Sequence, residues 1–123
     1  MDMRLFNVES SARAGGGVTF SLSGELDLST VEQLERAVSA NVDGKPELVV
    51  LDLRELAFLD SAGLRIMLQL QEKVATTGGR LALVKGSRRV HRVFELTGAD
   101  DELEIVADPS EIGRRPDLSA GKG

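Results

Sequence analysis

The chain has 123 residues, enough for one domain with its own core, and 41% hydrophobic and 28% charged residues are typical of a globular protein. The absence of cysteine excludes disulfides, thiolate metal sites and thiol catalysis. A net charge of −5, with no Trp, no Tyr and four Phe, argues against nucleic-acid binding by bulk electrostatics or base stacking.

No targeting or membrane segment is expected. The first residues, MDMRLFNVESS, lack the basic and then apolar succession of a signal peptide. No apolar run approaches the roughly 20 residues that span a bilayer. We therefore expect a cytoplasmic protein that binds neither membrane nor nucleic acid.

The first part of the chain predicts two strands and a helix. RLFNVESS (4–11) and VTFSLSG (18–24) are strand-like, and the glycines between them predict a hairpin. LSTVEQLERAVSANV (28–42) predicts a helix whose start fits a capping box, either Ser29 with Glu32 or Thr30 with Gln33. The residues expected on its buried face are Val31, Leu34, Val38 and Val42.

The second part predicts alternating strands and helices. ELVVLDL (47–53) is continuous enough to be a strand covered on both faces. A helix is expected from Ser61 to about Thr77, followed by a strand in RLALVKG (80–86). A short helix with Ser87 as N-cap and Gly98 as its end is expected next, and LEIVAD (103–108) predicts the last strand. The apolar face of the Ser61 helix consists of Leu64, Met67, Leu68, Leu70 and Val74.

This order predicts one α/β domain over residues 1–107. Strands that alternate with helices become parallel neighbours through right-handed crossovers, whereas the hairpin adds an antiparallel pair. We therefore expect a mixed, mostly parallel sheet with an N-terminal hairpin and three to four helices packed on it. Residues 108–123, with Pro109 and Pro116 and no apolar period, are expected to form a flexible C-terminal tail.

The segment LAFLDSAGL (56–64) places an acid and a hydroxyl, Asp60 and Ser61, between a strand and a helix. Either residue could cap the helix. Gly63 in the first turn costs roughly 1 kcal/mol relative to alanine, which indicates a close approach, either by a partner or by packing within the fold. A serine at this place lies near the carboxyl ends of the strands, beside free helix N–H groups that favour a phosphate. Phosphorylation of Ser61 should therefore change the surface without unfolding the protein.

Catalysis is the weaker interpretation. Ser61 lacks the G-x-S-x-G context, and His91 is the only histidine that could activate it. A hydrolase would require the fold to bring Ser61 and His91 together. The sequence contains neither a Walker loop nor G-x-G-x-x-G, and its acids lack metal-ligand spacing. We therefore expect no catalytic residue, no metal site and no cofactor.

A basic set surrounds the start of the predicted third helix, where positive charge opposes the helix dipole. Two interpretations remain open, a contact with an acidic partner and a solvated face, and the second is the simpler. The set consists of Lys85, Arg88, Arg89 and Arg92.

Three segments together resemble the STAS domain family, and specifically the bacterial anti-sigma factor antagonists. They are GELDLST (24–30), LVVLDLRELAFLDSAGL (48–64) and GGRLALVKGSRRVHRVFELTG (78–98). The resemblance covers about residues 4–107, and LDSAGL is its specific motif. Many relatives carry a second hydroxyl after the phosphoacceptor, whereas this chain has Ala62, which leaves Ser61 as the single acceptor there.

The resemblance implies a partner-switching regulator of transcription, in stress response or sporulation. In this family the unphosphorylated protein binds an anti-sigma factor, itself a serine kinase with the histidine-kinase-like ATPase fold, and thereby releases a sigma factor. Phosphorylation of the residue matching Ser61 ends that binding, and a metal-dependent serine phosphatase restores it. The alternative is a non-switching STAS scaffold or nucleotide-sensing module in a larger signalling complex. The implied partner-binding residues are Asp27, Leu28, Thr30, Asp60, Ala62, Gly63 and Leu64.

Overall fold

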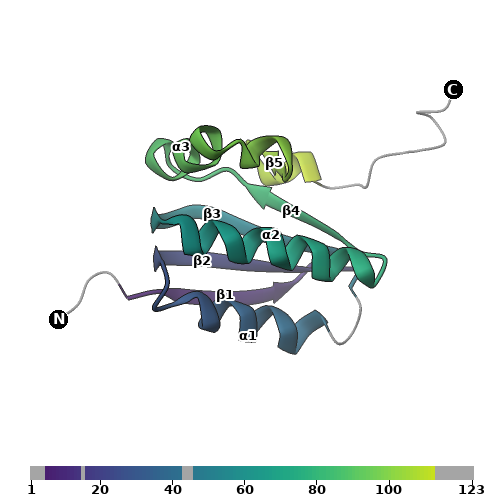
Figure 1. The fold of residues 1–123 in the computed structure, drawn as a ribbon. Coiled ribbons are helices and arrows are strands. Elements are labelled where there is room, and N and C mark those ends of the chain that lie inside the picture. Colours follow the sequence, from purple (N-terminus) through teal and green to yellow (C-terminus); the bar gives the residue numbers. More distant parts are fainter. Residues whose placement is uncertain (1–4, 15, 43–45, 113–123) are drawn as a thin grey trace, which may run out of the picture.

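The computed structural model describes residues 5–14, 16–42 and 46–112. Figure 1 shows their arrangement along the chain. The elements are β1 (Asn7–Ala12), β2 (Val18–Leu26), α1 (Val31–Val42), β3 (Leu48–Leu59), α2 (Ser61–Thr76), β4 (Arg80–Val84), α3 (Arg88–Thr97), a 3-10 turn η1 (Ala99–Asp101), β5 (Glu104–Val106) and a second 3-10 turn η2 (Pro109–Ile112).

The strands form one five-stranded sheet in the order β1-β2-β3-β4-β5. β1 pairs antiparallel with β2, and every other neighbouring pair is parallel. The predicted α/β class, with a mixed sheet and an N-terminal hairpin, is therefore confirmed. Because β2, β3 and β4 are parallel, their carboxyl ends meet at one end of the sheet, where α2 and α3 begin (Figure 1).

β3 is longer than predicted. It runs on past Leu53 to Leu59, through a polar stretch containing Arg54 and Glu55 that interrupts the apolar pattern. Pairing with β2 supports this extension, since Leu59 lies opposite Leu26 after two register shifts. The extension delivers Asp60 and Ser61 to the carboxyl end of the sheet.

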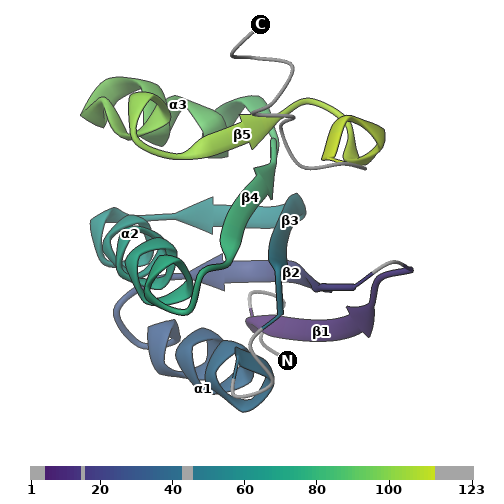
Figure 2. The same ribbon diagram turned by 90° about the vertical axis from the view of Figure 1, so that its right-hand side faces the viewer.

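The main core lies between one face of the sheet and the helices. Figure 2 shows α1 and α2 on the same side of the sheet, with η2 on the other side. Leu34 and Val38 of α1 are fully buried there with Met67 of α2, as predicted, while Leu68 is only partly buried. Each fully buried apolar side chain of this size contributes about 1.5–3 kcal/mol as an upper bound.

A smaller cluster on the opposite face corrects the predicted domain boundary. Val50, Ala82 and Val84 pack there with Ile112 of η2, which has an exposed fraction of 0%. The packed part of the chain therefore extends past residue 107 to at least Ile112. Residues 113–123, the rest of the segment that we expected to be a flexible tail, lie outside the described residues.

The ends of α3 match the prediction. The Ser87 hydroxyl accepts the Val90 N–H, and Gly98 ends the helix in the left-handed conformation with φ of 80°. The start of α1 differs, because the hydroxyls of Ser29 and Thr30 bond to the preceding turn instead of the helix. The buried face of α1 is confirmed for Leu34 and Val38, and the side chain of Val42 lies outside the described residues.

Candidate functional site

The carboxyl end of β3 leads directly into α2, and Asp60 is the cap between them. Its carboxylate Oδ1 accepts the Gly63 N–H at 3.0 Å. Its backbone N–H donates to the Leu26 carbonyl at 3.3 Å, which ties this junction to the end of β2. Of the two capping candidates, the structure selects Asp60.

Ser61 is the first residue of α2 and is exposed to solvent. Within the described residues, its hydroxyl forms no hydrogen bond. It lies beside the first N–H groups of a 16-residue helix, where the helix dipole favours negative charge. The hydroxyl is therefore accessible, and a phosphate attached to it would lie in a favourable field.

Gly63 is required by packing within the fold. A Cβ built on Gly63 would lie 2.5 Å from Leu59 Cδ1 and 2.8 Å from the Leu26 carbonyl oxygen. These approaches let the start of α2 lie directly on the ends of β2 and β3. Of the two causes that the sequence left open for this glycine, the structure provides the internal one.

The turn between β2 and α1 is organised by Asp27. Its Oδ1 accepts the Ser29 N–H at 2.9 Å and the Ser29 hydroxyl at 2.7 Å. The hydrogen bond from the Ser29 hydroxyl is the main reason why the pKa of Asp27 is lowered, against the opposing effect of desolvation. The Thr30 hydroxyl accepts the Asp27 N–H at 3.0 Å and lies 2.8 Å from the Glu25 carbonyl oxygen, to which it donates. The turn is thus held with an ionised carboxylate inside it.

The predicted partner-binding residues separate into accessible and supporting ones. Leu28 is 78% exposed, and Asp27, Thr30, Asp60 and Ala62 are half-buried. Gly63 and Leu64, by contrast, are buried. They can shape this surface from below, but they offer little of their own area to a partner.

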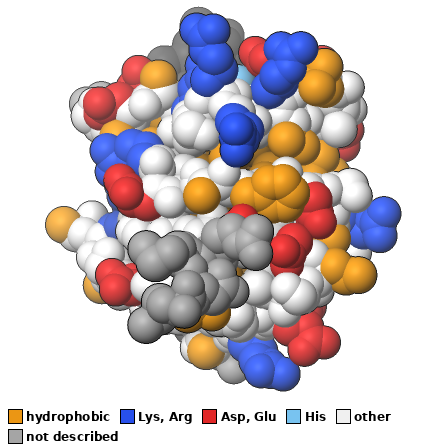
Figure 3. Space-filling model, turned by 90° about the vertical axis from the view of Figure 1, so that its left-hand side faces the viewer, with side chains coloured by type: hydrophobic (Ala, Val, Ile, Leu, Met, Phe, Trp, Pro, Cys, Tyr) orange, Lys and Arg blue, Asp and Glu red, His pale blue; other side chains and the backbone are white. Residues whose placement is uncertain are grey.

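Figure 3 shows this end of the molecule, with hydrophobic side chains in its middle and basic side chains in its upper part. The large apolar side chains exposed on the described chain are Leu5, Leu28, Phe58 and Leu96. Phe58, 38% exposed two residues before Asp60, was missed by the sequence reasoning because an apolar residue in an apolar strand is expected to be buried. Ser29 was considered only as a helix cap, although the Asp-x-Ser spacing is a known turn signal.

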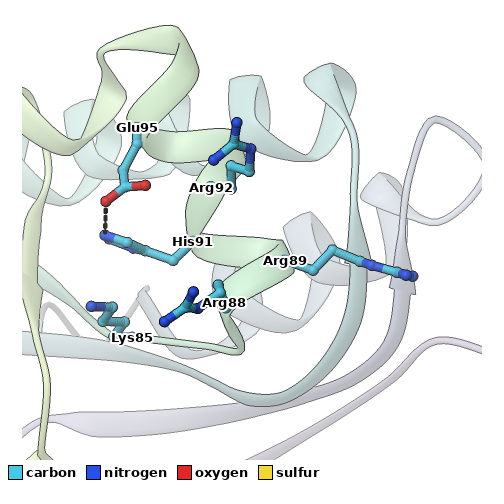
Figure 4. Close-up of a pocket in the computed structure, with 6 residues that line it drawn as sticks. All are labelled: Lys85, Arg88, Arg89, His91, Arg92 and Glu95. Atoms are coloured by element: carbon cyan, nitrogen blue, oxygen red, sulfur yellow. Dashed lines mark ion pairs between the residues drawn. The ribbon is translucent and has the colours of Figure 1, made fainter.

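His91 belongs to a different surface. It lies on α3 with Nε2 3.8 Å from Glu95 Oε2, and its ring stacks on Phe94 with centroids 6.0 Å apart. Figure 4 shows it in a depression lined by basic side chains of α3 and Lys85, and Ser61 is not among the lining residues. The Ser61–His91 pairing that a hydrolase would need is therefore not formed.

The described residues, 5–14, 16–42 and 46–112, contain neither a cluster of metal ligands nor a helix that could span a membrane. No group of three or more His, Cys, Asp or Glu side chains is placed to hold a metal ion in that part of the chain. Within the same ranges, every helix is too short or too polar to cross a membrane.

Comparison with known proteins identifies the family. The STAS domain matches residues 7–112, and the chain belongs to this family. It is 32% identical over 98 residues to an anti-sigma F factor antagonist of Lysinibacillus sphaericus, covering 79% of this chain and 84% of that protein. It is 34% identical over 92 residues to the anti-sigma-F factor antagonist RsfB of Mycobacterium tuberculosis, covering 75% of each.

Solved structures of anti-sigma factor antagonists have the same fold as this chain. An anti-sigma factor antagonist from Mycobacterium paratuberculosis superposes with a TM-score of 0.81 at 27% identity, covering 99% of this chain and 98% of the other. The antagonist SpoIIAA in its unphosphorylated form gives 0.70 at 26% identity, covering 89% and 95%. The resemblance to anti-sigma factor antagonists found in the sequence is thus confirmed, and these relatives support that general role.

Proposed function

We propose that this protein is an anti-sigma factor antagonist that is switched by phosphorylation of Ser61. In the unphosphorylated form it binds an anti-sigma factor and so releases a sigma factor. The anti-sigma factor is a serine kinase with the histidine-kinase-like ATPase fold, and a serine phosphatase reverses the modification. The observation that carries the proposal is the exposed Ser61 hydroxyl at the start of α2, which forms no hydrogen bond with any described residue.

The local chemistry supports a reversible switch. Because Asp60 caps α2, Ser61 can be modified without loss of the cap. A phosphate adds about −1.5 to −2 charges at neutral pH, and a helix N-terminus stabilises such charge. The fold should therefore tolerate the modification. SpoIIAA, which has the same fold, has been solved in a phosphorylated form as well.

The surface around Ser61 suits a protein contact. We assign Leu28 as an apolar contact and Asp27, Thr30, Asp60 and Ala62 as its half-buried surroundings, with Gly63 and Leu64 supporting them from below. Moving a binding equilibrium from 99:1 to 1:99 takes about 5.5 kcal/mol of differential affinity. An unpaired dianion in a desolvated interface costs several kcal/mol, which is of the required size.

The test uses paired baits. Ser61→Ala should retain the anti-sigma factor in a pull-down, and Ser61→Asp should lose most of it. Incubation of the wild type with ATP and the recovered kinase should add the mass of one phosphate, and Ser61→Ala should add none. Ser10→Ala, which removes another exposed hydroxyl on β1, outside the proposed partner surface, is the matched control and should still be phosphorylated.

Two results would contradict this function. Equal retention of the anti-sigma factor by Ser61→Ala and Ser61→Asp would contradict the proposed switch at Ser61. No gain of phosphate by the wild type would favour the non-switching scaffold or nucleotide-sensing module, in which Ser61 merely begins a helix.

A further inference from the structure

We propose that the start of α3 is a second docking surface for the anti-sigma factor, and that it receives an acidic segment of that protein. This α3 basic surface consists of Lys85, Arg88, Arg89 and Arg92. The inference rests on the proposed function, because it assigns a further contact to the same partner.

The charges of α3 run against its dipole. Arg88 and Arg89 occupy its first turn, where the helix carries partial positive charge, and Glu95 lies in its last turn, where acids are disfavoured. Proteins that break a local rule without compensation commonly do so at functional sites. If these cations served only to keep the face solvated, they could lie elsewhere on the helix with the same effect.

The described residues provide no compensation for these charges. Across the part of the chain that the structure describes, none of the four cations forms an ion pair with a carboxylate. The nearby Glu95 is directed to His91 instead (Figure 4). The whole chain has 20 acidic and 15 basic residues, yet residues 85–92 contain four cations and no acid. The positive charge is thus concentrated and available.

The directions of the side chains indicate an extended partner. In Figure 4, Lys85 and Arg88 lie on one side of α3 beneath His91, whereas Arg89 and Arg92 point away from them in other directions. Side chains that spread in this way are poorly placed to contact one small anion together. They fit a broad surface with several carboxylates.

The position of α3 connects this surface to the proposed switch. α3 follows the parallel strand β4, so it begins at the end of the sheet where β3 delivers Ser61. α2 and α3 are also in contact. Figure 3 shows the basic side chains above the hydrophobic centre of this end. The Ser61 region contributes the acids Asp27 and Asp60, so this face of the molecule carries both positive and negative charge. A partner with the complementary arrangement of charges would be oriented by it.

The test is the association rate of the full-length protein with the anti-sigma factor recovered by the Ser61→Ala bait. Arg88→Glu/Arg92→Glu reverses two charges one helical turn apart. The matched control, Arg36→Glu/Lys73→Glu, makes the same change in net charge on α1 and in the last turn of α2. Electrostatic steering predicts that the first variant associates about 10-fold or more slowly at low salt, and that this deficit shrinks as salt is raised.

Stability provides an internal check on folding. Removing cations from the start of α3 should leave the melting temperature unchanged or raise it by about 2–4 °C, because the dipole is then better matched. A slower association by a variant at least as stable as the wild type cannot come from misfolding. A variant that loses both stability and binding would contradict the dipole argument.

Each remaining outcome decides the proposal. If both double variants slow association equally, net charge is the cause and the α3 basic surface has no special role. If neither double variant slows association, the α3 basic surface is a solvated face that makes no contact with the anti-sigma factor. If micromolar ATP or inorganic phosphate shifts the NMR signals of the α3 amides and the shift reaches saturation, the surface is a small-anion site instead. If the wild type itself fails to bind the anti-sigma factor, the proposed function falls, and this inference with it.

Discussion

The Asp60 carboxylate accepts the Gly63 N–H at 3.0 Å, and this single bond separates two tasks at the start of α2. Asp60 stabilises the helix, while its neighbour Ser61 remains exposed and unbonded among the described residues. A residue that both capped the helix and accepted a phosphate would link recognition to unfolding. With the tasks divided, the proposed phosphorylation of Ser61 should change the charge of the surface and leave the fold intact.

Because Asp60 caps the helix and Ser61 does not, substitutions at these two positions should lower the free energy of unfolding by different amounts. Asp60→Ala should lower the free energy of unfolding by about 1 kcal/mol, because the Gly63 N–H loses its partner. Asp60→Asn should recover most of that, since Asn is an equally good cap. Ser61→Ala should change stability by less than about 0.5 kcal/mol. Urea denaturation measures all three, and a cost for Ser61→Ala as large as that for Asp60→Ala would show that Ser61 is structural.

Gly63→Ala should destabilise the protein although alanine is the better helix former. The propensity gain is about 1 kcal/mol, but the new methyl group would meet Leu59 at 2.5 Å and the Leu26 carbonyl oxygen at 2.8 Å. Overpacking against a backbone atom costs typically 1–3 kcal/mol. The difference is a net loss of up to about 2 kcal/mol in chemical denaturation. Gln69→Ala, at an exposed position of the same helix, is the control and should be nearly neutral, and a stabilised Gly63→Ala would refute the packing argument.

The Asp27 turn predicts a pH dependence. The pKa of Asp27 is lowered in the fold from its ordinary value of 3.8, chiefly by the Ser29 hydroxyl. Its stabilising contribution is therefore complete above the unfolded pKa and is lost as the pH falls through the lower folded pKa. Ser29→Ala should raise the pKa of Asp27 toward its ordinary value, as measured by NMR titration of the carboxyl carbon. Glu32→Ala, which leaves this turn intact, should not change it, and an unchanged value in Ser29→Ala would disprove the assigned cause.

Ile112→Ala should show that η2 belongs to the domain. The side chain is fully buried against Val50, Ala82 and Val84, so its truncation should cost about 2–5 kcal/mol. Leu96→Ala, at an apolar residue that is 72% exposed, should cost less than about 0.5 kcal/mol. Thermal or urea unfolding compares the two directly. Similar small losses for both would place the end of the domain before η2, as the sequence suggested.

Much of the fold was predictable because its signals are local. Ser87 and Gly98 mark the ends of α3 through their own backbone and hydroxyl chemistry, and both are where the sequence placed them. The alternation of strands and helices likewise determined the mostly parallel sheet. Three segments, of which LDSAGL is the most specific, indicated the STAS family, which the match over residues 7–112 confirms.

The parts that could not be predicted depend on contacts distant in sequence. Ile112 is a lone apolar residue in a polar segment, so no periodicity marks it, and only the cluster on the far face of the sheet explains its burial. The choice of Asp60 over Ser61 as cap depends on where β3 ends, which its pairing with β2 determines. Gly63 was ambiguous for the same reason, since its close neighbour Leu26 lies on another strand.

The most direct test of the account compares the phosphorylated and unphosphorylated wild-type protein in calorimetric titrations with the anti-sigma factor, together with their melting temperatures. We expect the phosphorylated form to bind at least about 100-fold more weakly, a difference of about 2.7 kcal/mol, while its melting temperature stays within about 4 °C of the other form. Equal affinities would contradict the switch, and weaker binding accompanied by a large loss of melting temperature would contradict the claim that Ser61 changes the surface and spares the fold.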